Sequence, residues 1–133
     1  MQGVDHILLN HALLPRHQRR MQNPSGQATM KERATRTKIR VYLRVQDERV
    51  VEATFLSRGH LPVTGCLSFL LMGLHGVPLQ VAISTHPAAL ACALRLPPEE
   101  EWCAEMAVDC LHAAVDDCVR RGAWRPQDAG EAA

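Results

Sequence analysis

Two stretches near the middle of the chain alternate apolar with polar residues. In residues 38–45, KIRVYLRV, isoleucine, valine and leucine occupy every second position between lysine, arginine and tyrosine. That period of two predicts a β-strand with one buried face. Residues 50–56, VVEATFL, predict a second strand, and the short QDER link between them predicts a hairpin. Residues 28–35 predict a third, weaker strand.

Most of the remaining chain has the spacing of helices. Residues 4–14 repeat apolar side chains every three or four positions and stop at Pro15, where a helix has to end. Residues 67–74 are apolar almost throughout and predict a buried helix. Residues 78–83 predict a short helical turn, and Thr85 is the predicted N-cap of the next helix.

A long helix is predicted after a pair of prolines. Pro97 and Pro98 suit a first turn, and the three glutamates that follow favour the positive N-terminal end of a helix. Small and apolar residues then recur on one side of this helix, at Cys103, Ala107, Cys110, Leu111, Ala114 and Cys118. Such a stripe lets a helix lie close to a sheet. The order of helix, strands and helices predicts an α+β fold, with helices packed on one face of a small antiparallel sheet.

Length and composition favour one soluble domain. The 133 residues are 47% hydrophobic and 22% charged, which suits a chain that buries one core. We assign residues 1–124 to this domain and expect residues 125–133 to form a disordered tail. The longest near-apolar run, residues 61–74, is too short and too broken to span a bilayer. The N-terminus has its charges after its apolar residues, the reverse of a secretory signal, so we expect a cytoplasmic protein without membrane contacts.

Charge is unevenly distributed, although the formal net charge is only +1. Ten arginines and lysines lie within residues 16–49, whereas acidic side chains dominate residues 99–117. The simpler interpretation is two solvated faces of opposite sign. The alternative is that the basic segment binds an acidic partner. Nucleic-acid binding is not expected, because the chain has one tyrosine and no aromatic-rich basic surface on which bases would stack.

Five cysteines in a reducing compartment predict free thiols or metal ligands rather than disulfides. We interpret Cys66, Cys92, Cys110 and Cys118 as core residues, because a free cysteine behaves as a small hydrophobe. Cys103 differs because it lies near the start of the long helix, a position that favours a reactive thiolate, although the neighbouring glutamates oppose this effect. Two interpretations of Cys103 stay open: a functional thiol and a member of the apolar stripe.

Four segments share their order and spacing with one known family. The first is VDHILLNHALLPRH, with His11, Pro15 and Arg16 in the family's positions. The second is the hairpin IRVYLRVQDERVVEATF, the third is Gly59 followed by an apolar helix, and the fourth is LPPEEEWCAEMAVDC. Over residues 4–122 the chain thus resembles the iron–sulfur cluster scaffold family, the IscU and NifU N-terminal domains. The resemblance implies a three-stranded antiparallel sheet, an N-terminal helix and a long C-terminal helix.

The resemblance also implies a ligand set from which this chain departs. Family members bind a [2Fe–2S] cluster or zinc through three cysteines, assisted by an aspartate and a histidine. The first cysteine and the aspartate are replaced here by Thr35 and Thr37, the second cysteine by His60, and the histidine by Trp102. Only the third cysteine is retained, as Cys103. His60 and Cys103 are therefore the candidate metal ligands, and Trp102 is expected to cover the former site.

One thiolate and one imidazole do not complete a zinc site or a cluster site, which need four ligands and mostly thiolates. We therefore expect no cofactor in the isolated monomer; a [2Fe–2S] cluster, iron or zinc would need ligands from an external thiol, a second subunit or a partner. The resemblance implies an accessory, scaffold-like protein of iron–sulfur assembly, with a cysteine desulfurase or another assembly protein as partner. The alternative is a metal-free interaction module on the same fold.

The glutamates after the prolines alter a motif of the IscU branch. There the Leu-Pro-Pro stretch continues with Val-Lys and resembles a chaperone-recognition peptide, whereas Glu99 and Glu100 reverse the charge here. The usual chaperone contact is therefore not expected. An enzyme using Cys103 as nucleophile would need a base and an orienting group. His60 would be the base, but the sequence offers no orienting acid, so we do not expect an enzyme.

Overall fold

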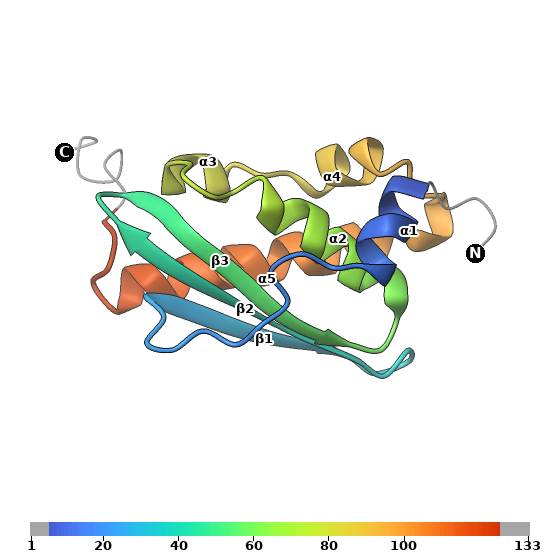
Figure 1. The fold of residues 1–133 in the computed structure, drawn as a ribbon, viewed down its shortest axis with the longest axis horizontal. Coiled ribbons are helices and arrows are strands. Elements are labelled where there is room, and N and C mark those ends of the chain that lie inside the picture. The colour runs from blue at the N-terminus through green and yellow to red at the C-terminus, as the bar shows by residue number, and fades with distance from the viewer. Residues whose placement is uncertain (1–5, 126–133) are drawn as a thin grey trace.

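A three-stranded antiparallel sheet and one long helix packed against it form the frame of the protein (Figure 1). The computed structural model describes residues 6–125. The strands, in spatial order, are β1 (Gly26–Glu32), β2 (Thr37–Gln46) and β3 (Arg49–Arg58). The helices are α1 (His6–Leu13), α2 (Leu61–Met72), α3 (Leu79–Ile83), α4 (Pro87–Ala93) and α5 (Glu101–Arg120), with the 3-10 turn η1 (Pro98–Glu100) leading into α5.

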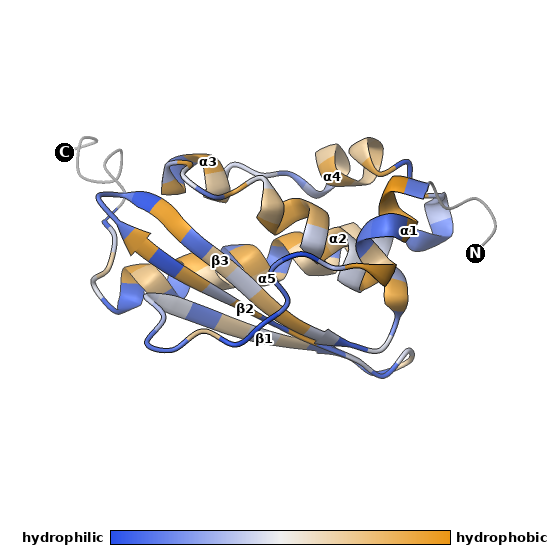
Figure 2. Ribbon diagram, in the orientation of Figure 1, coloured by the Kyte–Doolittle hydropathy of each residue, from blue (hydrophilic) through white to orange (hydrophobic). Residues whose placement is uncertain are grey.

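The predicted α+β fold is confirmed, including the N-terminal helix and the long C-terminal helix. Helix α5 contacts β1 and β2, and α2 contacts β3. Hydrophobic and hydrophilic residues alternate along the strands (Figure 2), and the inward residues Ile39, Val41 and Leu43 are all buried. Val41 pairs with Phe55 across β2 and β3, so the core lies between the sheet and the helices. No helix among residues 6–125 is long and apolar enough to cross a bilayer.

Several predicted boundaries were wrong. Strand β1 is Gly26–Glu32 instead of residues 28–35, because residues 33–36 form the turn into β2. Helix α2 begins at Leu61 instead of residue 67 and ends at Met72. Its Pro62 lies in the first turn, where the missing N–H is tolerated. Val4 of the predicted first helix, and residues 126–133 of the predicted tail, lie outside the described residues.

The predicted cap of α4 and one predicted core cysteine were also wrong. The N-cap is His86, whose Nδ1 accepts the N–H of Ala88 at 3.2 Å, instead of Thr85. Cys92 on α4 is exposed. Leu90 is the buried residue of this short helix, and a residue two positions further points away from it. Cys66, Cys110 and Cys118 are buried, as predicted, and Cys103 is buried as well.

Strand β1 lies so close to α5 that position 26 has no room for a side chain. A Cβ at Gly26 would lie 2.5 Å from Cys118 Sγ and 2.6 Å from the carbonyl oxygen of Ala114. The six residues of the predicted stripe on α5 are all fully buried. Their small size therefore brings the helix and the sheet backbone into direct contact.

An ionic contact fixes the end of α5 to the same strand. Asp117 Oδ2 accepts the backbone N–H of Gln27 at 3.0 Å. The carboxylate also pairs with Arg120 at 3.0 Å and with Arg121 at 2.9 Å. The hydrogen bond from Gln27, helped by the two guanidinium groups, holds the pKa of Asp117 below its usual value.

Replacing Asp117 by alanine is expected to lower the free energy of unfolding by about 1.5–3 kcal/mol, the range for hydrogen bonds to a charged group. The pKa of Asp117 is lower in the folded protein than in the unfolded chain, so its contribution is present at neutral pH. It is lost as the pH falls through the folded-state pKa, so the difference from wild type should shrink below about pH 4. Urea unfolding at several pH values measures this difference. The exposed neighbour Asp116, replaced by alanine, is the control, and a difference independent of pH would contradict the assignment.

Candidate metal centre

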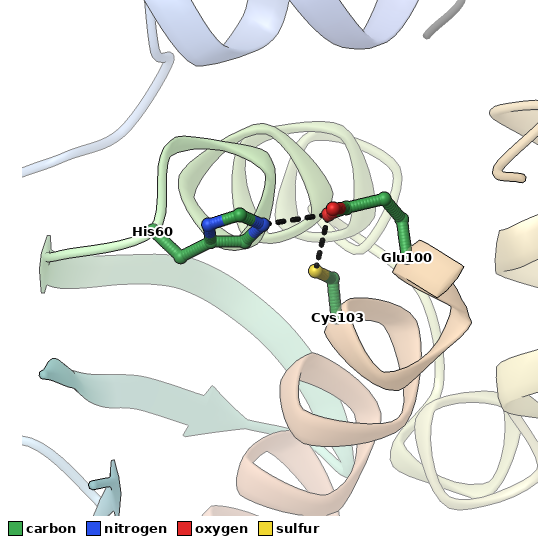
Figure 3. A group of neighbouring side chains, drawn as sticks. All are labelled: His60, Glu100 and Cys103. Atoms are coloured by element: carbon green, nitrogen blue, oxygen red, sulfur yellow. Dashed lines mark hydrogen bonds and ion pairs between the residues drawn. The ribbon is translucent and has the colours of Figure 1, made fainter. Parts of the chain in front are cut away.

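Three donor side chains from two segments meet at one end of the sheet (Figure 3). His60 lies between β3 and α2 and is the N-cap residue of α2. Glu100 ends η1, and Cys103 lies in the first turn of α5. One ligand atom from each residue lies within 4.8 Å of the other two. The predicted pair of His60 and Cys103 is therefore brought together, with Glu100 between them as a third candidate ligand.

Glu100 is hydrogen-bonded to both other side chains. Its Oε2 lies 2.6 Å from His60 Nε2 and accepts a hydrogen bond from Cys103 Sγ at 3.3 Å. Figure 3 shows the imidazole and the thiol pointing at the same carboxylate. The side chains of His60 and Glu100 are 30% and 19% exposed, whereas Cys103 is fully buried. The site is thus open to solvent on the histidine side and closed beneath the thiol.

The position of His60 depends on close contacts of its neighbours. Gly59 has a φ of +116° and lies against Thr37, where a Cβ would come within 2.5 Å of the Thr37 Cα, so only glycine suits position 59. The backbone N–H of His60 donates to Thr37 Oγ1 at 3.0 Å. The indole of Trp102 stacks on the imidazole, with ring centroids 5.2 Å apart and an interplanar angle of 28°. Together these contacts hold the imidazole next to Glu100.

The two threonines at former ligand positions lie beside this centre, but their hydroxyls are already used. Thr35 Oγ1 donates to Glu32 Oε1 at 2.6 Å. Thr37 Oγ1 therefore donates to Thr35 Oγ1, at 2.7 Å, and accepts the N–H of His60. The chain of hydrogen bonds ties the β1–β2 turn to the segment that carries His60.

Burial strongly raises the pKa of the Cys103 thiol, and the hydrogen bond to Glu100 raises it further. The buried thiol of Cys66 behaves similarly, with its pKa raised to about 12 by burial. Desolvation and a nearby carboxylate thus outweigh the helix dipole at Cys103, and the position does not favour a thiolate. His60 and Cys103 both contact Glu100, so they do not form the thiol–imidazole pair that an activated nucleophile needs.

Glu100 is a candidate ligand that the sequence alone did not indicate. We assigned its charge only to the helix start and to the altered chaperone motif. The sequence feature that could have indicated its place is the spacing to Cys103. Residues three apart on a helix face the same side, and Glu100 precedes Cys103 by three positions. The carboxylate stands where the IscU branch has a lysine, so the charge reversal supplies a metal-competent group within the centre.

The donor set fits a single metal ion better than a cluster. A thiolate, an imidazole and a carboxylate are ligands that zinc accepts, and three protein ligands leave the fourth position open. A [2Fe–2S] cluster needs four ligands and usually thiolates. Thr35 and Thr37 supply none. Cys66 lies in the same buried cluster as Cys103 and adds to the raised pKa of Cys103, but it is not among the donors that meet within 4.8 Å. The residues of this chain therefore do not fit a cluster without further ligands.

The family is decided by comparison with known proteins. A model of the NifU-like N-terminal domain matches residues 5–123. This chain belongs to that family. The resemblance inferred from the four segments is thereby confirmed. A comparison with curated proteins finds no match.

Solved structures share the NifU-like fold at low sequence identity. A protein named as an iron–sulfur cluster assembly scaffold protein for the SUF system, from Fervidobacterium islandicum AW-1, has a TM-score of 0.71 at 10% identity and covers 84% of this chain and 95% of its own. The N-terminal part of a nitrogen-fixing NifU-like protein from Brucella abortus has a TM-score of 0.66 at 17% identity, covering 88% and 92%. A protein described as hypothetical has a TM-score of 0.69 at 15% identity, covering 84% and 95%. These similarities show the fold.

The five cysteine thiols of this NifU-like domain are expected to react with an alkylating reagent at different rates at neutral pH. Cys92 is exposed and should react with iodoacetamide, whereas the other four cysteines are buried and should react only after unfolding. The raised pKa of Cys103 predicts that its labelling accelerates only at strongly alkaline pH. Mass spectrometry of timed samples locates the label, and a Cys92→Ser variant gives the background. Labelling of Cys103 as fast as that of Cys92 would restore the nucleophile hypothesis.

Proposed function

We propose that this NifU-like domain is an accessory protein of iron–sulfur assembly that holds a single iron or zinc ion on His60, Glu100 and Cys103. The observation that carries the proposal is the meeting of three donor atoms within 4.8 Å. Family membership supports the biological context, as does the scaffold function in the name of the Fervidobacterium neighbour. The protein binds and hands over its cargo in the cytoplasm and catalyses no reaction.

The chain's own residues prepare this site through hydrogen bonds. Glu100 orients the imidazole and the thiol toward one point, and the stacked Trp102 limits rotation of the imidazole. Coordination by Cys103 requires loss of the thiol proton, so ion binding releases a proton to solvent. A bound ion would supply Lewis acidity there, and three protein donors would leave a position for a further ligand. That position suits a ligand from an external thiol or from a partner.

The number of thiolates at the site explains the accessory role. A cluster bound here needs thiolates that this chain does not place at the site. A cysteine desulfurase or another assembly protein, a second subunit or a small thiol would supply them. Because Glu99 and Glu100 reverse the charge of the chaperone-recognition motif, the usual chaperone is not proposed as a partner.

A metal-free interaction module is the second candidate function. Its supporting observation is that Glu100 satisfies the hydrogen-bonding groups of His60 and Cys103 without an ion. The three side chains would then be a structural link between α2 and α5. The two candidates differ in metal affinity, which is directly measurable.

Cobalt(II), a spectroscopic substitute for zinc, is expected to bind with thiolate-to-cobalt charge-transfer absorption. The absorption should disappear in Cys103→Ser, and affinity should fall by about tenfold or more in Glu100→Gln and in His60→Ala. Cys92→Ser is the matched control and should bind as wild type does. Because the raised pKa keeps the Cys103 thiol protonated, affinity should rise by about tenfold per pH unit through neutral pH. No cobalt uptake, or equal uptake by Cys103→Ser, would favour the metal-free module.

Anaerobic reconstitution with iron and sulfide tests the cluster-sharing role. The isolated chain is expected to stay colourless, because it offers one thiolate at the site. Visible charge-transfer absorption should appear when a cysteine desulfurase or an external thiol is added, and Cys103→Ser should abolish it. An absence of absorption under every condition would overturn cluster sharing, while leaving the single-ion site to the cobalt titration.

A further inference from the structure

Cations without an ion pair in the described part of the chain gather at the end of the sheet that carries the candidate metal centre. Of the ten basic residues in the segment 16–49, Arg19 and Arg44 pair with Glu52, and Arg49 donates to the Gly76 carbonyl oxygen. Seven other cations line two adjoining hollows, and we call them the basic face: Arg20, Lys31, Arg33, Arg36, Lys38, Arg40 and Arg58. Arg58 comes from outside the basic segment of the sequence. The structure thus places most of the unpaired basic residues of the segment 16–49 on one surface.

The register of the strands places three of these cations in one row. Lys38 on β2 pairs with Lys31 on β1 and with Arg58 on β3. Like charges directly opposite each other destabilise a sheet. No acid among residues 6–125 forms an ion pair with any of the three. The fold therefore tolerates a repulsion that an external anionic partner would relieve.

One acid lies among the residues that line the two hollows. Glu32 lines the larger hollow, but its carboxylate accepts the backbone N–H groups of Ala34 and Thr35 and the hydroxyl of Thr35. These bonds fix the turn between β1 and β2. Glu32 keeps its negative charge, but the seven cations that line the two hollows outnumber it, so this surface stays positive.

The two hollows form one continuous surface because they share Lys38 and Arg58. The larger, of about 520 Å³, lies over the β1–β2 turn. The smaller, of about 330 Å³, extends over β2 and β3 to Arg20, with Leu56 among its lining residues. Arg20 belongs to the segment after α1, which pairs with the edge of β3 through a bridge from Gln18 to Phe55. An extended chain suits this shape better than a compact anion does.

We infer that the basic face binds an acidic segment of a partner protein, with carboxylates placed against Lys31, Lys38 and Arg58. Complementary charge favours such a partner and accelerates its association. Neither hollow has an aromatic lining residue, so a single-stranded nucleic acid would find no stacking surface. The inference goes beyond the proposed function and does not require a metal at His60.

The basic face is also next to the candidate metal centre. Thr37 lines the larger hollow, and its hydroxyl accepts the backbone N–H of His60. A partner seated on the basic face would therefore come close to the proposed ligands. Its docking would be separable from metal binding, because the two use different side chains.

Fluorescence anisotropy of a labelled oligoglutamate peptide tests the inference on metal-free full-length protein at low ionic strength. The double variant Lys38→Glu/Arg58→Glu is expected to bind the peptide at least about tenfold more weakly. The control Arg49→Glu/Arg125→Glu changes the net charge equally but leaves the basic face intact, and it should bind within about twofold of wild type. Equal loss in both double variants would show an effect of net charge and overturn the inference.

Parallel measurements test whether nucleic acid or a second copy of this chain binds the basic face instead. A labelled oligothymidylate of equal charge should bind more weakly than the peptide; tighter binding that the Lys38/Arg58 variant abolishes would overturn the inference in favour of nucleic acid. Sedimentation that shows self-association through this face would overturn it in favour of a second copy. Circular dichroism confirms folding of the variants. Gain of oligolysine binding by Lys38→Glu/Arg58→Glu would support the assignment of the face independently of lost affinity.

Discussion

The direct contact of α5 with the sheet is the constraint on which the rest of the structure depends. Position 26 admits only glycine because Cys118 and the backbone of α5 occupy the space of a side chain. Protein interiors are closely packed, so a helix held this near to the sheet cannot shift along it independently. The carboxylate of Asp117 adds a directional hydrogen bond to β1 at the far end of the helix. The start of α5 is thereby placed at the opposite end of the sheet, beside the β1–β2 turn and the segment that follows β3.

That placement gives the candidate metal centre its chemistry. Cys103 is both a member of the packed stripe and a donor at the centre, so the two interpretations of this residue are compatible. Its burial explains why the thiol stays protonated, and Glu100 explains why two polar side chains are satisfied at the edge of an apolar core. A buried polar group without a partner would be costly. The carboxylate thus stabilises the protein as it stands and supplies a ligand for an ion.

The sequence was most informative where one local pattern decided the structure. Alternation in β2 and the stripe on α5 both follow from fixed side-chain periods, so the hairpin of β2 and β3 and the long helix were correctly placed, whereas the bounds of β1 were not. The start of α2 was missed because Pro62 resembles a helix breaker until its position in the first turn is known. His60 and Cys103 were found through family positions, whereas Glu100 was not, because its role depends on where η1 directs a side chain. Pairings across strands, such as Lys38 with Arg58, likewise depend on register and not on local sequence.

The donors of the candidate centre come from positions that are far apart along the chain. His60 precedes α2, whereas Glu100 and Cys103 follow α4. An ion held by all three would close a long loop that contains α2, α3 and α4, and a cross-link of this kind removes freedom mainly from the unfolded chain. Occupancy and global stability would then be thermodynamically linked. Delivery of the cargo would remove this stabilisation of the folded state, so the unloaded form would be the one more exposed to proteolysis.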